Sequence, residues 1–459
     1  MLFRSLVLGA GSGGYACALR AAQLGLKVGL VEKGNLGGTC LHVGCIPTKA
    51  LLHAAEVADS AREASQFGVS ASLDGIDMAG VNAYKDKVVD RLFKGLTGLV
   101  KSRGITVIQG AGVLTGPREV TVDGTAYTGR AVVLASGSYS RSLPGLEVDG
   151  ETVLTSEHAL RLDRVPASAI VLGGGVIGCE FASVWKSFGS EVTIVEALPR
   201  LVAAEDEASS KALERAFRKR KIDFRTSTSY KSLKVTDTGV AVTVEGADGE
   251  SVIEAEVLLV AVGRGPSTDG LGYAEQGVAM ERGFVLADER CRTNVEGVYA
   301  VGDIVPGLQL AHRGFAHGIL VAEQIAGLDP RPVPEAGIPR VTYTHPEVAS
   351  VGLTEDAARE TFGADAVETV TYDLGGNGKS QILRTQGFVK LVRRADGPVV
   401  GIHLVGDRVG ELIGEAQLIY NWEGYADDVA PLLHAHPTQH EALGEAHLAL
   451  AGKALHAHG

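Results

Sequence analysis

The stretch LVLGAGSGGYACALRAAQLGLKVGLVEKG, residues 6–34, decides the fold. Its apolar start predicts a β-strand, its Ala-rich middle has helical spacing, and KVGLV predicts a second strand that ends at Glu32. Gly9, Gly11 and Gly14 have the G-x-G-x-x-G spacing between the first strand and the helix. Such glycines permit a tight turn and let a pyrophosphate contact the backbone at the helix N-terminus, while the acidic residue reaches a ribose hydroxyl. The stretch therefore predicts a dinucleotide-binding βαβ unit.

The same unit occurs a second time in residues 170–200, IVLGGGVIGCEFASVWKSFGSEVTIVEALPR. Its glycines are Gly173, Gly175 and Gly178, its acid is Glu196, and each lies 164 positions after its counterpart in the first copy. A single G-x-G-x-x-G is a weak signal because Gly-rich loops are common. Two copies with the same strand, helix, acid and spacing are a strong one, and we infer two nucleotide sites.

A third signal is TNVEGVYAVGDI, residues 293–304, an apolar strand that ends at Gly302 and Asp303. Open α/β sheets bind ligands at the carboxyl ends of their strands, which is where Asp303 stands. On its own, an aspartate in this position is more often a turn residue.

The bulk composition limits the classes of function. A chain of 459 residues suggests about three domains. The formal charge of −12 and the lack of a basic stripe argue against nucleic acid as a partner. No apolar run reaches the roughly 18–20 residues of a membrane span, and MLFRSLVLGAG is interpreted as a first strand and not a signal peptide. Five cysteines fit a reducing compartment, so we expect a cytoplasmic location.

Two of these cysteines, Cys40 and Cys45, lie in GGTCLHVGCIPTKAL, residues 37–51. They could be a structural staple, a pair of metal ligands or a redox disulfide. A staple is disfavoured by the compartment, and closing so small a loop stabilises a chain by only roughly 2 kcal/mol. A metal site would need further ligands, for which His42 and His53 are the only nearby candidates.

Together these motifs resemble the flavoprotein disulfide reductase family, in its dihydrolipoamide dehydrogenase branch, over essentially the whole chain. The resemblance is strongest in residues 37–52, 173–180, 293–303, 342–354 and 434–441. It implies an α/β fold with two Rossmann-like domains, the first for FAD and the second for NAD, followed by a C-terminal α+β dimerisation domain. The implied boundaries are 1–145 for the first part of the FAD domain, 146–264 for the NAD domain, 265–335 for the central FAD part and 336–459 for the dimerisation domain.

The resemblance also assigns roles around the cysteine pair. It implies that Cys40 and Cys45 form the redox disulfide, with Cys40 exchanging with a dithiol substrate and Cys45 lying against the flavin as a charge-transfer thiolate. Cys45 also begins an apparent helix, and a helix N-terminus favours a thiolate. Lys49 on that helix matches the lysine that pairs, beside the flavin ring, with the glutamate matched by Glu180.

The segment HAHPTQHEAL, residues 434–443, matches the family pattern His-Pro-Thr-x-x-Glu. The resemblance makes His436 the base that takes the dithiol proton, and Glu441 the residue that orients it. A thiol with a pKa near 8.5 is a poor nucleophile until an imidazole deprotonates it. His434 and His436 could also form a metal pair, but no third ligand accompanies them, so we expect no metal.

The cofactor-binding positions implied by the motifs and the resemblance can be given together. They are Gly9, Gly11, Gly14, Glu32, Thr39, Lys49, Gly112, Ser136, Gly137, Asp303, Ala311, Gly173, Gly175, Gly178, Glu196 and Gly263.

Some positions depart from the family pattern, although none removes a catalytic group. The departures are His42 in place of Asn, Ser136 in place of Thr, Gly265 in place of Arg, the segment 313–318 without its usual acid, and Gln439–His440 in place of Leu–Ser.

The implied activity is reoxidation of protein-bound dihydrolipoamide through the disulfide and FAD, with hydride passed to NAD. The enzyme would serve a 2-oxo acid dehydrogenase complex or the glycine cleavage system. Its implied partners are a second copy of the chain, whose disulfide His436 would reach, and a lipoyl domain. Because no lipoyl domain precedes the first strand, we expect that domain on a separate acyltransferase or carrier chain.

Several alternatives are weighed against this interpretation. Glutathione reductase-like enzymes use NADPH and usually carry two lysines after Cys-Val-Pro, where this chain has Thr48 and Lys49. Mercuric reductases and large thioredoxin reductases need a C-terminal redox pair, and no cysteine follows Cys291. A soluble transhydrogenase typically lacks the cysteine pair. A structural flavoprotein subunit would not need the set of cysteines, His436 and Glu441.

Overall fold

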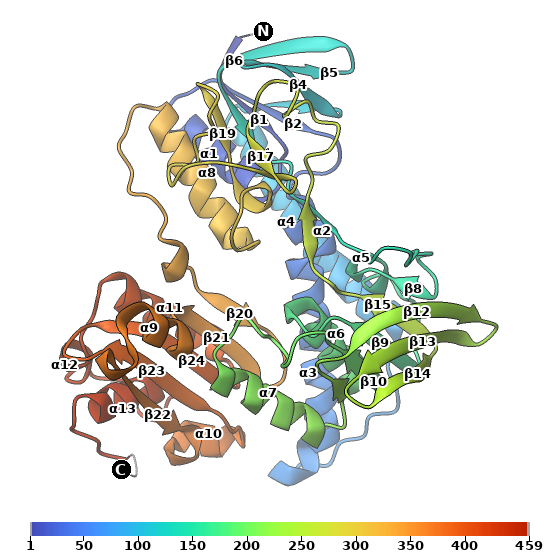
Figure 1. Cartoon of the computed structure of the whole chain (residues 1–459), viewed down its shortest axis with the longest axis vertical. Coiled ribbons are helices and arrows are strands. Elements are labelled where there is room, and N and C mark those ends of the chain that lie inside the picture. Colours follow the sequence, from blue (N-terminus) through green and yellow to red (C-terminus); the bar gives the residue numbers. More distant parts are fainter. Residues whose placement is uncertain (1, 457–459) are drawn as a thin grey trace.

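Residues 6–34, with the first G-x-G-x-x-G, form the centre of a seven-stranded sheet in the computed structural model, which describes residues 2–456 (Figure 1). The sheet belongs to the N-terminal unit, and its order is β3-β2-β1-β6-β5-β4, with β19 also paired to β6. Its strands are β1 (Leu2–Leu8), β2 (Val28–Glu32), β3 (Thr106–Gln109), β4 (Gly112–Gly116), β5 (Glu119–Val122), β6 (Thr125–Leu134) and β19 (Val298–Ala300). The strands β1, β2, β3, β6 and β19 pair in parallel, as βαβ connections require.

Two helices of this unit, α1 (Ser12–Gln23) and α8 (Ala311–Ile325), lie side by side although about 300 residues separate them (Figure 1). Their close approach depends on glycines. A Cβ on Gly318 would lie 2.2 Å from the carbonyl oxygen of Gly13, and a Cβ on Gly13 would lie 3.2 Å from that of Gly314. Larger residues at these positions would separate the helices and move the start of α8.

The middle unit repeats the parallel architecture with the order β11-β10-β9-β15-β8. These strands are β8 (Val153–Leu154), β9 (Ser168–Leu172), β10 (Glu191–Val195), β11 (Asp223–Arg225) and β15 (Val257–Val260), and α6 (Val176–Phe188) joins β9 to β10. The same unit contains a second, antiparallel sheet, inserted in the chain between β11 and β15. Its strands are β12 (Ser229–Thr236), β13 (Gly239–Gly246) and β14 (Gly249–Ala255). The chain passes between the two units twice, and the passages pair as β7 (Ser138–Ser140) and β16 (Arg264–Pro266).

The C-terminal unit is a five-stranded antiparallel sheet of order β20-β21-β24-β23-β22 covered by helices. Its strands are β20 (Arg340–Thr342), β21 (Glu347–Gly352), β22 (Val367–Asp373), β23 (Phe388–Arg394) and β24 (Val399–Gly406). The helices are α9 (Glu355–Phe362), α10 (Gly378–Leu383), α11 (Val409–Asn421), α12 (Ala426–Val429) and α13 (Glu441–Leu450). Two parallel nucleotide units and an antiparallel third confirm the predicted fold class.

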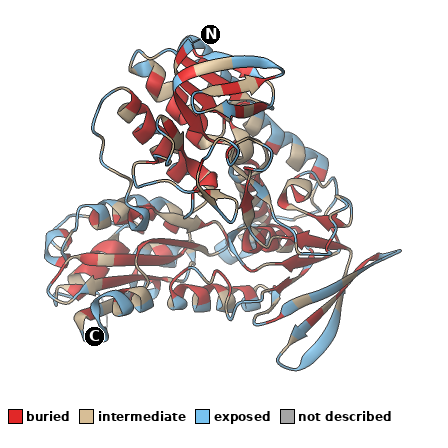
Figure 2. Ribbon diagram, turned by 45° about the horizontal axis from the view of Figure 1, so that its top comes forward, coloured by how far each residue is buried: buried red, intermediate tan, exposed pale blue. Residues whose placement is uncertain are grey.

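Helices α2 (Gly38–Val43), α3 (Cys45–Glu63) and α4 (Met78–Ser102) run from the N-terminal unit towards the middle unit, where α3 packs against α6. Figure 2 shows that burial concentrates in the sheets and on the inner helix faces. Shorter elements are α5 (Ser156–Ala159), α7 (Glu207–Lys219), β17 (Met280–Glu281), β18 (Phe284–Val285), η1 (Ala64–Phe67), η2 (Gly302–Ile304), η3 (Glu335–Gly337), η4 (Ala364–Ala366) and η5 (Leu374–Gly376). Within residues 2–456 no helix has both the length and the apolar character that crossing a membrane requires.

Buried charges join the middle unit to the C-terminal unit. Lys390 on β23 lies 2.8 Å from Asp206, the residue that caps α7, and 2.7 Å from Glu355 on α9. The Lys390 and Asp206 side chains are only 8% and 2% exposed. A single ammonium therefore fixes a helix of the middle unit against the sheet of its neighbour.

Candidate functional site

The first glycine turn has the shape that a pyrophosphate needs. Gly9 has a φ of +103°, and a Cβ there would lie 2.3 Å from the carbonyl oxygen of Ala135. A Cβ on Gly14 would lie 1.8 Å from the carbonyl oxygen of Gly9. Gly11, in contrast, has no atom within 4 Å of its Cβ position, and no side chain caps the N-terminus of α1. The outer glycines thus close the turn, while the middle one leaves room for a phosphate at the helix N-terminus.

The second turn reproduces this geometry. A Cβ on Gly173, whose φ is +111°, would lie 2.3 Å from the carbonyl oxygen of Ala261. A Cβ on Gly178 would lie 1.9 Å from the carbonyl oxygen of Gly173, and Gly175 again has nothing within 4 Å. Here too the N-terminus of α6 has no side-chain cap.

The two acids also occupy equivalent positions. Glu32 accepts hydrogen bonds from the N–H groups of Ala10 and Gly34, each at 2.7 Å. Glu196 accepts from Gly174 at 2.6 Å and from Leu198 at 2.7 Å. Each carboxylate is therefore held beside its glycine turn, where the ribose of a bound dinucleotide would lie.

Several other predicted cofactor positions gather around the first turn. Asp303 lies in η2 directly after β19 and accepts a hydrogen bond from Ser138. Ser136 follows β6 and accepts one from Tyr273 at 3.0 Å. Gly112 packs against the side chains at the ends of β1 and β2. Thr39 lies within α2, Gly137 after β6 and Ala311 at the start of α8, whereas Gly263 follows β15 in the middle unit.

The cysteine pair lies at the junction of two helices. Cys40 is in α2, and Cys45 is the first residue of α3, so both sulfurs are fixed by helical backbone. Both are free thiols in this structure. The pKa of Cys45 is lowered to about 7, chiefly because the Cys40 thiol donates a hydrogen bond to it. Burial acts in the opposite direction, and the charge of Lys49 lowers the pKa further. The same hydrogen bond and burial raise the pKa of Cys40. The pair therefore holds one proton on Cys40 and presents a thiolate at Cys45 near neutral pH.

Lys49 and Glu180 form an ion pair between α3 and α6. The ammonium lies 2.7 Å from both carboxylate oxygens of Glu180, which is 2% exposed. Burial acts to lower the pKa of Lys49, but Glu180 and Cys45 outweigh it, and the pKa is raised. Tyr343 completes the arrangement, because its ring lies 4.7 Å from the Lys49 ammonium and its N–H donates to Glu180 at 3.0 Å.

His436 and Glu441 form a second pair in the C-terminal unit. His436 Nδ1 lies 2.8 Å from Glu441, which also accepts from the N–H of Thr438 at 2.7 Å. Burial would raise the pKa of Glu441, but these hydrogen bonds lower it. The carboxylate thus orients the ring with Nε2 free, and the His436 side chain is 78% exposed. In Figure 1, α13, which follows His436, lies in the C-terminal unit, away from α2, which carries Cys40 in the N-terminal unit.

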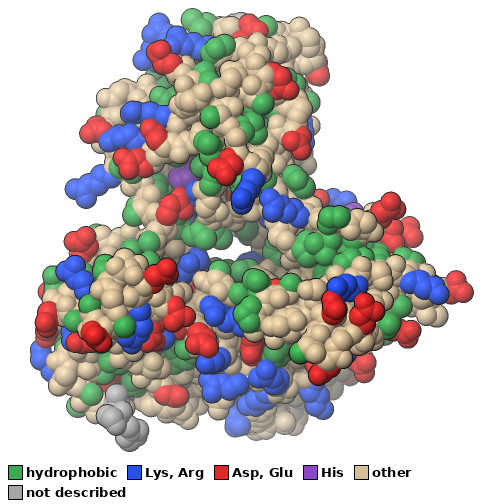
Figure 3. Space-filling model, viewed as in Figure 1, with side chains coloured by type: hydrophobic (Ala, Val, Ile, Leu, Met, Phe, Trp, Pro, Cys, Tyr) green, Lys and Arg blue, Asp and Glu red, His purple; other side chains and the backbone are tan. Residues whose placement is uncertain are grey.

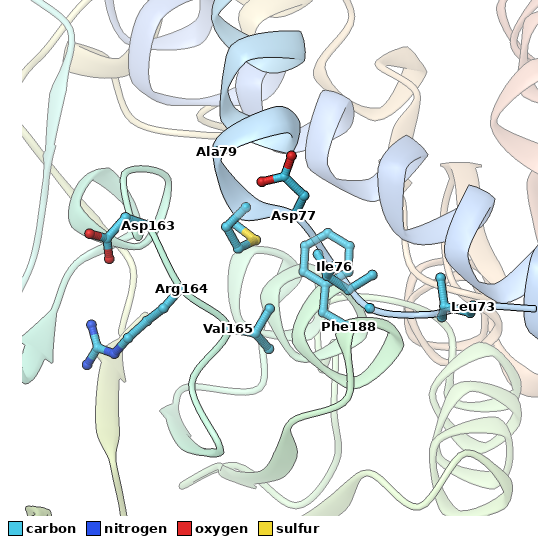
Figure 4. Close-up of a pocket in the computed structure, with 10 residues that line it drawn as sticks. Leu73, Ile76, Asp77, Ala79, Asp163, Arg164, Val165 and Phe188 are labelled. Carbon is cyan, nitrogen blue, oxygen red and sulfur yellow. The ribbon is translucent and has the colours of Figure 1, made fainter.

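Figure 3 shows the face of the molecule hollowed where the three units meet. A separate cavity of about 540 Å³ lies between the segment before α4 and the middle unit (Figure 4). Its lining includes Ile76, Val165, Arg164 and Phe188 but neither cysteine and no residue of the glycine turns. We therefore do not assign the redox chemistry to this cavity. Within residues 2–456 no three His, Cys, Asp or Glu side chains are grouped to hold a metal ion.

Some residues of the site are not apparent from the sequence. A Cβ on Gly38 would lie 2.7 Å from the Cα of Gly11, so this glycine lets α2 approach the first turn. The pair Gly37–Gly38 in the cysteine motif was the available signal. Tyr343 lies in a stretch that resembles the family, but its sequence does not reveal the contact with Lys49. Arg264 donates to Ser138 at 2.8 Å, a contact that only the fold brings about.

Two dinucleotide turns and a dithiol with one acidic thiol define an oxidoreductase that exchanges electrons between a sulfur pair and two dinucleotides. The family described as pyridine nucleotide-disulphide oxidoreductase matches residues 3–318, and its dimerisation domain matches residues 338–447. The chain belongs to this family, whose cofactors, FAD and NAD, are the ones that the two turns fit.

Individual members of the family are similar to this chain over nearly its whole length. The chain is 41% identical to a dihydrolipoyl dehydrogenase of Bacillus subtilis, with 98% of each chain covered. It is 42% identical to one from Chlorobaculum parvum, with 97% of this chain and 96% of the relative covered. The crystal structure of LpdA from Mycobacterium tuberculosis superposes with a TM-score of 0.90 at 27% identity, covering 97% of this chain and 99% of that one.

Proposed function

We propose that this chain oxidises the dihydrolipoyl group of a carrier protein and passes the electrons to NAD. The observation that carries the proposal is the thiol pair Cys40–Cys45, in which the hydrogen bond from the Cys40 thiol, and then the charge of Lys49, favour a thiolate at Cys45. The pair lies at the start of α3, and the Lys49–Glu180 contact links it to the helix of the second nucleotide turn. The names of the relatives, dihydrolipoyl dehydrogenases, support the same substrate.

The oxidised enzyme carries a disulfide between Cys40 and Cys45. His436 takes the proton of one substrate thiol, and the resulting thiolate attacks Cys40, so the disulfide breaks and Cys45 leaves as a thiolate. The second substrate thiol, deprotonated in turn, attacks the substrate sulfur bonded to Cys40. Lipoamide leaves as a cyclic disulfide, and the protein has gained two electrons. Of the two protons taken from the substrate thiols, one passes to the Cys40 sulfur as it is expelled, because the pKa of Cys40 is raised, and one is released.

The first turn, with Glu32, Asp303 and the start of α8, would hold FAD, and the second turn with Glu196 would hold NAD. FAD supplies the two-electron chemistry that connects a dithiol to a nicotinamide. In this scheme Glu441 orients His436, Lys49 keeps Cys45 ionised, and Glu180 keeps Lys49 in place. The remaining cofactor-binding positions that the motifs and the family resemblance imply are proposed as cofactor contacts on the same grounds.

We further propose that the working molecule is a homodimer, because the exposed His436 lies in the segment that matches a dimerisation domain. The division at residues 1–145, 146–264, 265–335 and 336–459 is part of this proposal, and the three sheets support it. The lipoyl group would arrive on a separate chain of a 2-oxo acid dehydrogenase complex or the glycine cleavage system. The small and odd number of cysteines, five in 459 residues, supports a location in the cytoplasm.

Steady-state kinetics with two substrate pairs test the function. We expect turnover of free dihydrolipoamide with NAD, and a kcat/KM at least about a hundredfold lower for reduction of oxidised glutathione by NADPH. Preferred use of glutathione and NADPH would refute the proposal in favour of a glutathione reductase. Loss of NADH-dependent disulfide reduction in the FAD-loaded protein would favour a structural flavoprotein.

A further inference from the structure

A second histidine–carboxylate group lies beside His436. Glu415 projects from α11, and each of its oxygens meets a different imidazole. Oε1 lies 2.8 Å from Nε2 of His434, and Oε2 lies 3.1 Å from Nδ1 of His440. The two histidines stand two residues before and four residues after His436. One carboxylate thus binds the chain on both sides of the proposed base.

The group is partly removed from solvent. The side chains of His434 and Glu415 are 12% and 26% exposed, whereas that of His440 is 47% exposed. Burial would raise the pKa of Glu415, but hydrogen bonds from the two imidazoles lower it. The bond to Glu415 in turn raises the pKa of His434. Charge and hydrogen bonding therefore act together to hold the three side chains in one arrangement.

The segment that carries His436 needs such support. Residues 431–440 contain no helix or strand, so no backbone ladder fixes them. Side chains hold them instead, since Gln439 donates to the carbonyl of Asp407 at 2.9 Å and Asn377 donates to that of Thr438 at 3.0 Å. Glu415 adds two contacts from a regular helix. His440 is one of the departures from the family pattern, where serine is usual.

We propose that Glu415 is a positioning residue for His436, which it holds in place through the imidazoles of His434 and His440. The inference rests on the proposed function, because the position of His436 affects the rate only if His436 is the base that deprotonates the substrate thiol. A displacement of about 1 Å in a reacting group can cost roughly a hundredfold in rate. The hydrogen bonds of Glu415 oppose that displacement on both flanks of the base, and His440 adds a contact that a serine would not make.

The test compares variants that remove or retain each contact. We expect Glu415→Ala to lower kcat for dihydrolipoamide oxidation by roughly ten- to a hundredfold, with the KM for NAD unchanged. Asparagine places an amide near the position of histidine Nδ1, so H440N should recover most of the activity that H440A loses. Glutamine places an amide near the position of histidine Nε2, so the activity of H434Q should exceed that of H434A. Glu411→Ala, an exposed change one turn earlier on α11, is the matched control and should behave like the wild type.

Two further readouts separate positioning from damage to the fold. FAD content and NADH-dependent dye reduction, which do not need His436, should be unchanged in Glu415→Ala. If Glu415→Ala loses FAD, the test rests instead on the activities of H440A and H440N, because His440 is the most exposed of the three side chains. Mixed dimers of Glu415→Ala with Cys40→Ser should regain activity, because one site then combines a normal Cys40 with a normal His436 segment. Mixed dimers of Glu415→Ala with His436→Gln should not.

A kcat for Glu415→Ala within twofold of the wild type would overturn the inference, as would equal loss of activity in H440A and H440N. Failure of the wild-type protein to oxidise dihydrolipoamide would instead overturn the proposed function, and this inference with it.

Discussion

The ammonium of Lys49 lies 2.7 Å from each carboxylate oxygen of Glu180. Lys49 stands one helical turn after Cys45 on α3, and Glu180 follows the last glycine of the second nucleotide turn on α6. One ion pair thus connects the redox thiols to the helix that begins the second nucleotide site. It also fixes a positive charge beside the thiol that must ionise.

The first prediction concerns the ionisation of Cys45. Its lowered pKa of about 7 means that the thiolate is present above that pH and is protonated below it. Lys49→Met removes a charge that favours the thiolate, so the midpoint should move to higher pH. The measurement is the pH dependence of alkylation of Cys45 by iodoacetamide in the reduced protein, located by peptide mass spectrometry. Lys87→Met, an exposed change on α4, is the control, and an unchanged midpoint in Lys49→Met would contradict the assigned role.

The second prediction concerns the two cysteines themselves. Cys40→Ser and Cys45→Ser should each retain FAD and the fold, because a disulfide across so small a loop contributes little to stability. Each variant should lose oxidation of dihydrolipoamide yet still reduce a dye with NADH. Dihydrolipoamide turnover at the wild-type rate in either variant would rule out the disulfide as the redox centre.

The third prediction concerns the choice of nucleotide. Glu196 would face the 2′-phosphate of NADP at a cost of about 1 kcal/mol per unit charge in water and about 4 kcal/mol at an effective dielectric near 20. Each 1.4 kcal/mol corresponds to about a tenfold change, so NAD should exceed NADP in kcat/KM by one to several orders of magnitude. The nearby cation, Arg200, is turned towards the carbonyls of Ala203 and Glu205, at 3.0 and 3.3 Å. Glu196→Gln should reduce the preference, and equal kcat/KM values in the wild type would be incompatible with this site.

The fourth prediction concerns the buried Lys390. Lys390→Met leaves Asp206 without its cation, which should lower the free energy of unfolding by roughly 3–5 kcal/mol. Burial would raise the pKa of Asp206, but His403, Lys390 and the N–H of Glu355 lower it. This stabilisation is present above the ordinary aspartate range and is lost as the pH falls through the folded-state pKa.

Guanidinium unfolding of the wild type and of Lys390→Met at several pH values provides the measurement. The difference between them should hold from pH 7 down to about 4 and shrink only as the pH falls further, through the lowered pKa of Asp206. Lys211→Met, which removes an exposed ion pair on α7, should change stability little. Equal effects of the two substitutions would show that burial of Lys390 does not matter.

The sequence predicted the parts of the molecule in which local chemistry repeats a known pattern. The spacing of Gly9, Gly11 and Gly14 and of their second copy was sufficient for both parallel units, because only such glycines permit the turn. The resemblance supplied the pairing of Lys49 with Glu180, 131 residues apart in the chain. The helix that begins at Cys45 was also predicted, and α3 confirms it.

Contacts that depend on how distant elements pack were not predictable from one sequence. Tyr343 reaches Lys49 only because β20 leads into the junction of α3 and α6. Glu415 has no motif of its own, and α11 must first pack against the sheet before its carboxylate meets the two imidazoles. Gly38 could have been recognised from the paired glycines before the cysteines, but its contact with Gly11 depends on the path of α2.

The most direct test of the account is the reassembly of two inactive variants, Cys40→Ser and His436→Gln, into mixed dimers. If His436 serves the disulfide of the partner subunit, each mixed dimer has one site with both defects and one intact site. Random reassortment makes about half the dimers mixed, so about a quarter of the wild-type dihydrolipoamide:NAD activity should return. If both residues of a site belong to one chain, every site in the mixture carries a defect. Activity no greater than that of the two variants alone, in a preparation that mass spectrometry shows to contain mixed dimers, would contradict the shared site.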